Sequence, residues 1–497
     1  MKKILTMAAM ALLMTACSND IDEPQAQQQP ANTDGMITIT AKLAPKSDAG
    51  TRAVTPGTDS QSKDIIKVTW AENEHLAILY EVSGEKKVAD ATITAVDATT
   101  GAATMTFAVD GSTADDTPCT IVYPLAAAKD DKTGVKDAAT LLAAQKGTLN
   151  ANLDVRVGAG TISTTTPSLA VTTQPVAQFA IHKFKIQDLS ATDKTATEFK
   201  VSDASGNVIA TVTPVSATGT LYVALPVMAA GTYWFKATVG GNPYIAKATV
   251  ATATTAGNYY QTTVKLATVG NIIGADGKFY ANKTAVDAAA TTGAAMIVYL
   301  GSDGETNATY NHGLAIALTD ASTSAKWGTY NADAGLTKYT HWCQGDDDAS
   351  TDMTGIANTA ALKTLYNGNT DYEAANAVSG YSVAGFTPGD HGFSGWFLPS
   401  AGQWYKFLNG MCGLAWTGGY GWATGTGSDN FNTVNAKFTA AGYDTDDAKF
   451  ENGNWYWSSS EYSLGNAVDV KFDSDDGVLV GHNGKLGPDR VRCFLAF

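Results

Sequence analysis

The chain has 497 residues, which at ~150 residues per domain predicts about three domains. Charged residues make up 16% and hydrophobic residues 44%, a balance that excludes a disordered polyelectrolyte and a multi-span membrane protein. The 33 Lys and Arg against 48 Asp and Glu give a formal net charge of −15, which would repel phosphate backbones, so we expect no nucleic-acid partner. The 48 Gly, with many Ala and Thr, favour a mainly β fold.

The first 16 residues are typical of a secretory signal peptide, with Lys2 and Lys3, an apolar run from Ile4 to Met14, and small residues before Cys17. The run is too short to cross ~30 Å of hydrocarbon. The residues that end at Cys17 resemble a bacterial lipobox, with Met14 where leucine is preferred. This resemblance implies that Cys17 is lipidated; an ordinary cleaved signal is the alternative. The acidic SNDIDEP that follows resembles the surface-export signal of Bacteroides-type lipoproteins and implies an outer-membrane protein that faces outward.

A flexible tether and one strand follow. Residues 17–35 are polar and rich in Gln, Pro and Asn, which predicts a tether. Residues 36–43 alternate apolar and polar, which predicts a strand with one buried face formed by Ile37, Ile39, Ala41 and Leu43. The Gly, Pro and Ser of residues 45–63 then predict a loop with the Arg52-Ala53 bond exposed in its middle.

Residues 65–268 consist of short strand-like segments separated by turn signals, which predicts two β-sandwich domains. We place the boundary near residue 170, which gives domains at 36–170 and 171–268.

The composition changes near residue 270, and eight of the ten tryptophans lie between residues 327 and 457. Helical spacing of apolar residues predicts helices over 355–367 and 400–412, the second with Ser400 as its N-cap. Residues 269–497 are therefore predicted to form an α+β domain.

Residues 36–268 resemble the fimbrillins, the subunits of type V pili of Bacteroidales-type bacteria. The order and spacing of five segments carry this resemblance: Val68-Thr69-Trp70 with His75–Tyr80, Ile121–Pro124, Phe179–Phe184, Ala256–Tyr260 and Thr262–Leu266. The family implies two transthyretin-like β-sandwiches, export as a lipoprotein, and cleavage by an Arg-specific protease. Arg52 and Ala53 match the cleavage position.

Such a cut would give the strand 36–43 a function. Removal of residues 17–52 would leave an open apolar groove and unpaired backbone groups at its edges. A strand from another fimbrillin subunit could fill this groove by strand addition. The alternative is that residues 51–53 are an ordinary linker in a permanently anchored lipoprotein.

Residues 269–497 resemble the Fibrobacter-type major paralogous domains, which implies a C-type-lectin-like fold. The segments that match are Gly395–Ser400 with Trp404, Trp455–Glu461, Asp489–Cys493, Val269–Ile273 and His312–Leu318. We expect Trp396, Trp404 and Trp457 to form core rather than to bind ligand.

Ligand binding is instead expected in the loops between these motifs. Aromatic rings beside carboxylate and amide groups suit sugars, and the candidates are Trp416, Tyr420, Trp422, Asp429 and Asn430. An exposed Gly-rich connector is the alternative for this loop. The acidic runs at 346–348 and 473–476 lack EF-hand spacing and are expected to be solvated loops rather than calcium sites.

No cofactor, metal or catalytic site is predicted. The histidines have no paired metal-ligand spacing, and the cysteines lie in no nucleophile or CxxC motif, which argues against an enzyme. At most one disulfide is expected, among Cys343, Cys412 and Cys493.

The sequence therefore predicts a pilus tip adhesin, lipidated at Cys17, cut after Arg52, and carrying a C-terminal domain that binds a glycan or protein. It would begin at the outer membrane and end in the fimbria. The alternative is a cell-surface lipoprotein that stays anchored and binds glycans or proteins without polymerising.

Overall fold

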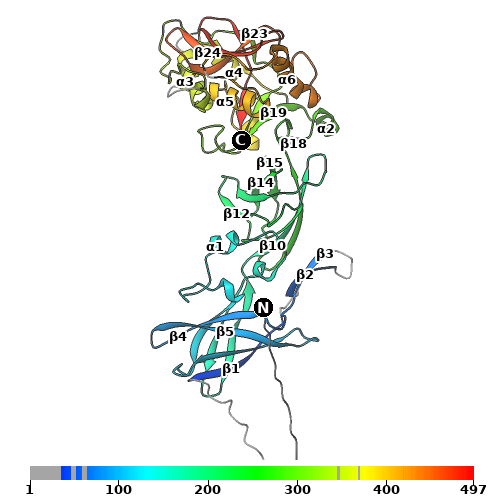
Figure 1. Ribbon diagram of the computed structural model, residues 1–497, viewed down its shortest axis with the longest axis vertical. Helices are drawn as coiled ribbons and strands as arrows, with labels where there is room; N and C mark the ends of the chain where they lie inside the picture. Colours follow the sequence, from blue (N-terminus) through cyan, green and yellow to red (C-terminus); the bar gives the residue numbers. More distant parts are fainter. Residues whose placement is uncertain (1–34, 46–51, 59–63, 344–347, 368–369, 418) are drawn as a thin grey trace, which may run out of the picture.

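The protein is mainly β and is built from three units stacked end to end along its long axis (Figure 1). The computed structural model describes residues 35–45, 52–58, 64–343, 348–367, 370–417 and 419–497. No helix within these ranges is both long and apolar enough to cross a membrane.

The first unit is a closed barrel in the order β1-β6-β5-β4-β7-β8-β9. We expected a β-sandwich here; the seven strands close into one barrel because β1 pairs with both β6 and β9. Alternating side chains, as on β6, point inward and fill the interior. The strands are β1 (Met36–Leu43), β4 (His75–Val82), β5 (Glu85–Val96), β6 (Ala103–Asp110), β7 (Thr117–Tyr123), β8 (Arg156–Ser163) and β9 (Ser168–Ala177).

The barrel extends past the predicted boundary at residue 170. Strand β9 remains paired with β8 as far as Ala177, so the chain leaves the barrel only after that residue. Between β7 and β8 lie three short helices, η1 (Leu125–Ala127), α1 (Ala138–Ala143) and η2 (Ala151–Leu153). They help to cover a small apolar cluster between the barrel and the second unit.

The second unit consists of two sheets that enclose a shared core. One sheet has the order β13-β10-β16, with β10 and β16 parallel, and the other has the order β12-β11-β14-β15. The strands are β10 (Ala180–Asp188), β11 (Glu198–Asp203), β12 (Val208–Val212), β13 (Thr220–Leu225), β14 (Gly231–Val239), β15 (Asn242–Val250) and β16 (Tyr259–Leu266).

The third unit combines helices with two sheets, as the α+β prediction requires. The first sheet has the order β18-β17-β19-β20-β27 and the second β21-β26-β23-β24-β25-β22. The strands are β17 (Ile272–Gly274), β18 (Phe279–Tyr280), β19 (Gly293–Leu300), β20 (Gly313–Ala317), β21 (Ser322–Ala325), β22 (Gly421–Trp422), β23 (Asn454–Glu461), β24 (Asn466–Asp473), β25 (Gly477–Gly484), β26 (Asp489–Val491) and β27 (Phe494–Ala496).

Both predicted helices are confirmed. The first is α3 (Gly355–Tyr366); the second is α5 (Ala401–Tyr405), which continues as a π-helix, η5 (Lys406–Met411). The side chain of Gln403 accepts a hydrogen bond from the backbone N–H of Ser400 at 2.9 Å, which fixes the start of α5.

Five further helices among the described residues of the third unit were not predicted. The longest, α6, includes Asp429 and Asn430, two of the residues that we expect in a loop. Its buried positions Val434 and Phe438 lie four residues apart on one face. The five are α2 (Lys283–Ala288), η3 (Ala349–Thr351), α4 (Glu373–Gly380), η4 (Pro388–His391) and α6 (Gly427–Ala440).

The tryptophans expected in the core are there. Trp404 and Trp457 are fully buried and Trp396 is 9% exposed. The prediction that these rings form part of the core of the third unit is therefore confirmed.

Candidate functional site

The first strand, β1, closes the barrel. It pairs antiparallel with β6 through eight residue pairs, from Met36 opposite Asp110 to Leu43 opposite Ala103. On its other side it pairs parallel with β9 at only one position, Thr40 opposite Ser168. The barrel is therefore closed through β1. The pairing of β1 with β9 is much less extensive than its pairing with β6.

The alternation predicted for this strand is confirmed. Ile39, Ala41 and Leu43 are at most 4% exposed, Ile37 is half-buried, and the residues between them are exposed. Ile39 lies opposite Phe107 and Ala41 opposite Met105, both buried on β6. The inward face of β1 thus alternates large and small side chains to match its neighbour.

Two contacts hold the end of β1 to the rest of the barrel. The backbone N–H of Ala44 donates to Oε1 of Gln174 on β9 at 3.2 Å. The carbonyl of Ala44 accepts from Nε1 of the buried Trp70 at 3.4 Å. These contacts and the pairing with β6 would all be lost if β1 were removed.

Without β1, β6 would pair only with β5, and β9 only with β8. Both would become sheet edges with unpaired N–H and C=O groups. Between them would lie the space that Ile39, Ala41 and Leu43 occupy. An edge on each side of an apolar groove is what an added strand requires.

The predicted cleavage position lies on a strand and not in a loop. Arg52 begins β2 (Arg52–Thr58), which pairs antiparallel with β3 (Asp64–Val68). Arg52 lies opposite Val68, and the register shifts between Arg52 and Thr55, so Ala53 is in an irregular part of the pairing. The two strands form a separate ribbon that projects from the barrel (Figure 1). The predicted lipidation residue, Cys17, lies outside the described residues.

The last strand, β27, is placed very differently from β1. It pairs with β20, and Phe494 also bridges to Phe397. All three of its residues are fully buried. Phe497 packs beside Trp234 of the second unit, with ring centroids 6.2 Å apart, so this end of the domain lies at the junction of two units (Figure 1).

The five residues predicted to bind ligand do not all face solvent. Trp416 is half-buried; its Nε1 donates to the carbonyl of Gly421 at 3.1 Å, and its ring packs edge-on against Trp342. Tyr420 is half-buried and donates to the carbonyl of Tyr339 at 3.0 Å. Burial raises the pKa of Tyr420 above its usual value, so the hydroxyl stays protonated.

Asn430 is buried within α6 and donates to the carbonyls of Ala423 and Thr424, which makes it a structural residue. The expectation that it lies in an open loop is therefore wrong. Asp429, its neighbour, is exposed. Trp422 is 39% exposed on the edge strand β22, with Nζ of Lys471 at 5.5 Å from its ring centroid. Of the five predicted residues, only Trp422 and Asp429 present an exposed side chain.

The acidic run at 473–476 closes a turn. Asp473 accepts from the backbone N–H groups of Asp475 and Asp476 and pairs with Lys471 at 2.8 Å. Its pairing with Lys471 and these backbone bonds lower the pKa of Asp473 to about 2. Among the described residues no group of three or more His, Cys, Asp or Glu is arranged to hold a metal ion.

Two of the three cysteines considered for a disulfide are buried free thiols. Cys412 and Cys493 are at most 7% exposed and do not pair with each other. Burial raises the pKa of Cys412 to about 12, which keeps it an unreactive thiol.

Sequence reasoning missed one further site, a cleft between the second and third units that contains Lys236 and His312. In the sequence, His312 begins the segment His312–Leu318 that resembles the major paralogous domains, and Lys236 follows three aromatic residues in a segment that indicates a strand. Nothing local in the sequence shows that these two residues meet, because 75 residues separate them.

No protein-family model matches the sequence, and no curated protein matches it. Solved structures do match. A fimbrial protein from Bacteroides ovatus is 13% identical with a TM-score of 0.30, over 92% of this chain and 99% of that one. A fimbrial assembly protein from Parabacteroides distasonis is 13% identical with a TM-score of 0.26, over 46% and 90%.

A third match is the tip fimbrial protein Mfa3 from Porphyromonas gingivalis, with a C-terminal truncation. It is 11% identical with a TM-score of 0.22, over 43% of this chain and 81% of that one. The chain is similar to these fimbrial proteins, and none of the likenesses assigns a role to an individual residue.

Proposed function

We propose that this protein is a fimbrial subunit that accepts a strand from another subunit in place of β1. The single observation that carries the proposal is the position of β1, which bonds to both neighbouring strands and precedes all the other strands of the barrel in the chain. A single cut after Arg52 would make this strand separable. The cut would turn a closed barrel into an acceptor groove.

Export as a lipoprotein through Cys17 would hold the subunit at the outer membrane with its groove still filled. Before cleavage, the attached β1 would block premature assembly, because an intramolecular strand competes at a high effective concentration. After cleavage the subunit would pass from the outer membrane into the fimbria.

The placement of β27 supports a tip position. A subunit inside a fibre must both accept a strand and supply one. Residues 494–496 are fully buried and paired, so they could be donated only if the third unit unfolded. We therefore propose that the protein accepts a strand without donating β27, and that the third unit is displayed as the adhesive domain.

We further propose that this third unit has a C-type-lectin-like fold and binds a glycan or protein ligand. Trp422 and Asp429 are the exposed members of the predicted set and are the residues through which we expect contact. An exposed indole can stack on the C–H face of a sugar while a carboxylate accepts bonds from its hydroxyls.

The test is the mature N-terminus of the protein in shed fibres and in the outer membrane, read by mass spectrometry. We expect Ala53 as the N-terminus in fibres, and acylated Cys17 in the membrane. The variant Arg52→Ala should stay in the membrane and leave the fibres. Lys46→Ala, which removes another cation of the same connection, should mature normally.

An acylated Cys17 in every fraction, with residues 36–43 retained, would contradict the proposal. That result would instead favour a permanently anchored surface protein that binds its ligand without polymerising. The closed barrel, with β1 in place, is already suited to that alternative.

A further inference from the structure

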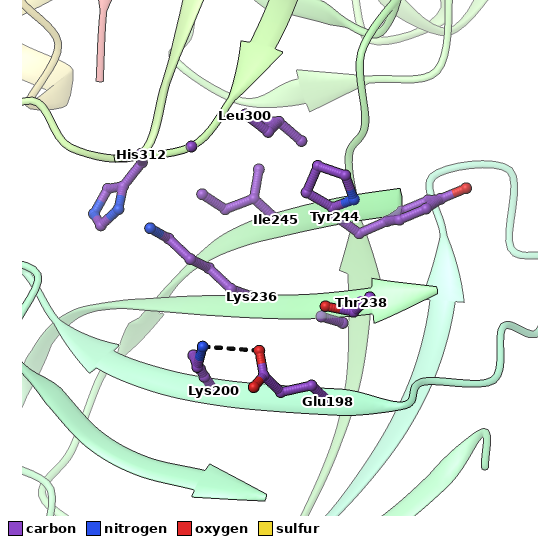
Figure 2. Close-up of a pocket in the computed structure, with 11 residues that line it drawn as sticks. Glu198, Lys200, Lys236, Thr238, Tyr244, Ile245, Leu300 and His312 are labelled. Carbon is purple, nitrogen blue, oxygen red and sulfur yellow. Dashed lines mark ion pairs between the residues drawn. The ribbon is translucent and has the colours of Figure 1, made fainter. Parts of the chain in front are cut away.

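A cleft of about 160 Å³ lies where the second unit meets the third, away from β1 and from Trp422. Strands β11, β14 and β15 form one side, and the chain at Leu300, Gly301 and His312 forms the other (Figure 2). A cavity of about 150 Å³ accommodates one six-membered ring. The cleft is therefore of the right size for a single ring or a short chain.

Lys236 supplies an unneutralised positive charge inside the cleft. It is half-buried, and its ammonium donates to the carbonyl of Asn311 at 3.3 Å. No carboxylate among the described residues forms an ion pair with it, whereas nearby Lys200 pairs with Glu198 at 2.8 Å. Burial, with a smaller effect from Lys200, lowers the pKa of Lys236. The charged ammonium is therefore destabilised in the cleft, and a bound anion would stabilise it.

His312 adds a buried polar atom without a hydrogen-bond partner, its Nδ1. Its side chain is only 4% exposed, its ring lies 4.2 Å from that of Trp234, and no partner is found for its Nδ1. Burial and the nearby Lys236 and Lys247 lower the pKa of His312 to about 3, so the ring is neutral. Figure 2 shows the imidazole beside the end of the Lys236 side chain. A buried polar atom without a partner costs free energy unless a ligand or water satisfies it.

The remaining walls are largely apolar. Ile245 and Leu300 are buried, and the rings of Pro243 and Tyr244 lie beside them. Thr238 and the Lys200–Glu198 pair supply polar groups at the other side of the cleft (Figure 2). One cation, an apolar wall and a few neutral or paired polar groups would suit a ring that carries both a carboxylate and hydroxyls.

We propose that this cleft binds the carboxylate of a sugar acid of the uronic type, through Lys236 and His312, with the sugar ring against Ile245 and Leu300. The net charge of −15 would repel acidic ligands from most of the surface. An acidic ligand would therefore bind preferentially where a local cation such as Lys236 lies in a cleft. The ammonium would donate a charge-assisted hydrogen bond to the carboxylate. The site is separate from the strand-acceptor groove, so it does not depend on the proposed function.

Titration calorimetry on the full chain with D-glucuronate, D-glucose and butyrate would test this. We expect saturable binding of glucuronate, with glucose at least about tenfold weaker because it lacks the carboxylate. Butyrate should also be weaker, because it has no hydroxyls for the polar side of the cleft. This comparison uses the unmodified protein and does not rely on a variant that folds.

Lys236→Met should reduce the affinity for glucuronate at least about tenfold. Lys265→Met makes the same charge change at an exposed residue of β16 and should leave the affinity unchanged. Absence of glucuronate binding, equal binding of glucose, or unchanged affinity in Lys236→Met would each overturn the proposal. Equal binding of butyrate would overturn the assignment to a sugar acid.

Discussion

The barrel and the third unit each contain a strand that lies near one end of the described chain, and the two strands are held in opposite ways. In β1 the buried and exposed residues alternate, so one face packs inward and the other meets solvent. In β27 all three residues are buried. A strand buried on one face can be exchanged for another strand with the same alternation, whereas a strand buried on both faces is part of the core.

The largest effect should come from a chain that begins at Ala53. Ile39 and Leu43 would each contribute ~1.5–3 kcal/mol through burial, so the barrel should lose at least about 3 kcal/mol of unfolding free energy. Hydrogen exchange should become fast at the amides of β6 and β9 that face the groove. A synthetic peptide of residues 35–45 should restore their protection.

Two altered peptides control this experiment. Ile39→Asp with Leu43→Asp places charges on the inward face and should abolish rescue. Thr38→Ser with Thr40→Ser changes only exposed positions and should rescue as well as the native peptide. If the amides of β6 stayed protected without any peptide, β1 would not be the element that closes the barrel.

The same comparison predicts that a destabilising substitution in β27 cannot be rescued by an added peptide. Phe494 is fully buried, with its ring 5.4 Å from that of Trp404. Phe494→Ala should cost ~3–5 kcal/mol in the third unit, measured by urea unfolding. Leu464→Ala, at a residue 47% exposed in the same unit, should cost less than ~0.5 kcal/mol.

A peptide of residues 491–497 should not restore the stability of the Phe494→Ala variant, because the defective strand still occupies its place. Rescue by that peptide would mean that β27 exchanges as readily as β1. The distinction between the two strands, and with it the argument for a tip position, would then fail.

Carboxyl groups of the two units should respond to pH in different ranges. In the third unit, Asp469 and Asp489 form a buried acidic pair, and burial raises the pKa of Asp489 to about 6, and that of Asp469 well above its usual value. The folded state therefore binds more protons than the unfolded state above pH ~4, so stability falls as pH rises through 6. In the barrel, the backbone N–H groups of Thr165 and Thr164 lower the pKa of Asp115, so its contribution to stability is lost only as the pH falls below ~4.

Between pH 5 and pH 8 the ionisation of Asp489 should cost the third unit about 1.4 kcal/mol of unfolding free energy. This cost is measured by urea unfolding as the difference between the native protein and Asp489→Asn, because the buried neutral His312 of the same unit shifts stability in the other direction. Asp489→Asn should flatten this dependence, because it removes one of the two charges. Asp473→Asn, at a carboxyl whose pKa is lowered, should leave the loss in place. An Asp489→Asn variant with the same pH dependence as the native protein would contradict the raised pKa of Asp489.

Local patterns predicted the local structure well. The alternation of residues 36–43 gave β1 with the correct inward face, and apolar spacing gave α3 and α5. The closure of the barrel could not be read in the same way, because the pairing of Thr40 with Ser168 joins residues far apart in the chain. The boundary at residue 170 failed because β9 continues through it.

The candidate binding residues were less predictable than the strands. The start of α6 favours a loop by composition, because it contains Gly427, Asp429 and Asn430. The helical spacing of the apolar residues Phe431, Val434 and Phe438 was the local signal that could have predicted the helix. Trp416 is half-buried because it packs against Trp342, a contact that no local pattern contains. Trp422 is 39% exposed on the edge strand β22.

The smallest effect on stability should come from a change at Trp422, which tests the proposed ligand binding of the third unit rather than its folding. Trp422→Ala should change the unfolding free energy by less than ~0.5 kcal/mol because the side chain is 39% exposed on an edge strand. Binding to a panel of immobilised oligosaccharides should nevertheless fall at least about tenfold, since a stacked aromatic ring is lost.

Trp416→Ala is the matched control. It removes a nearby indole that packs against Trp342 and donates a hydrogen bond to the carbonyl of Gly421. It should cost ~1–2 kcal/mol of stability, partly from the aromatic pair. Retained oligosaccharide binding in Trp422→Ala would place the contact elsewhere on the third unit. A loss in Trp422→Ala at unchanged stability would mean that the third unit acts through a side chain, in contrast to the barrel, for which we propose an action through the backbone edges that β1 covers.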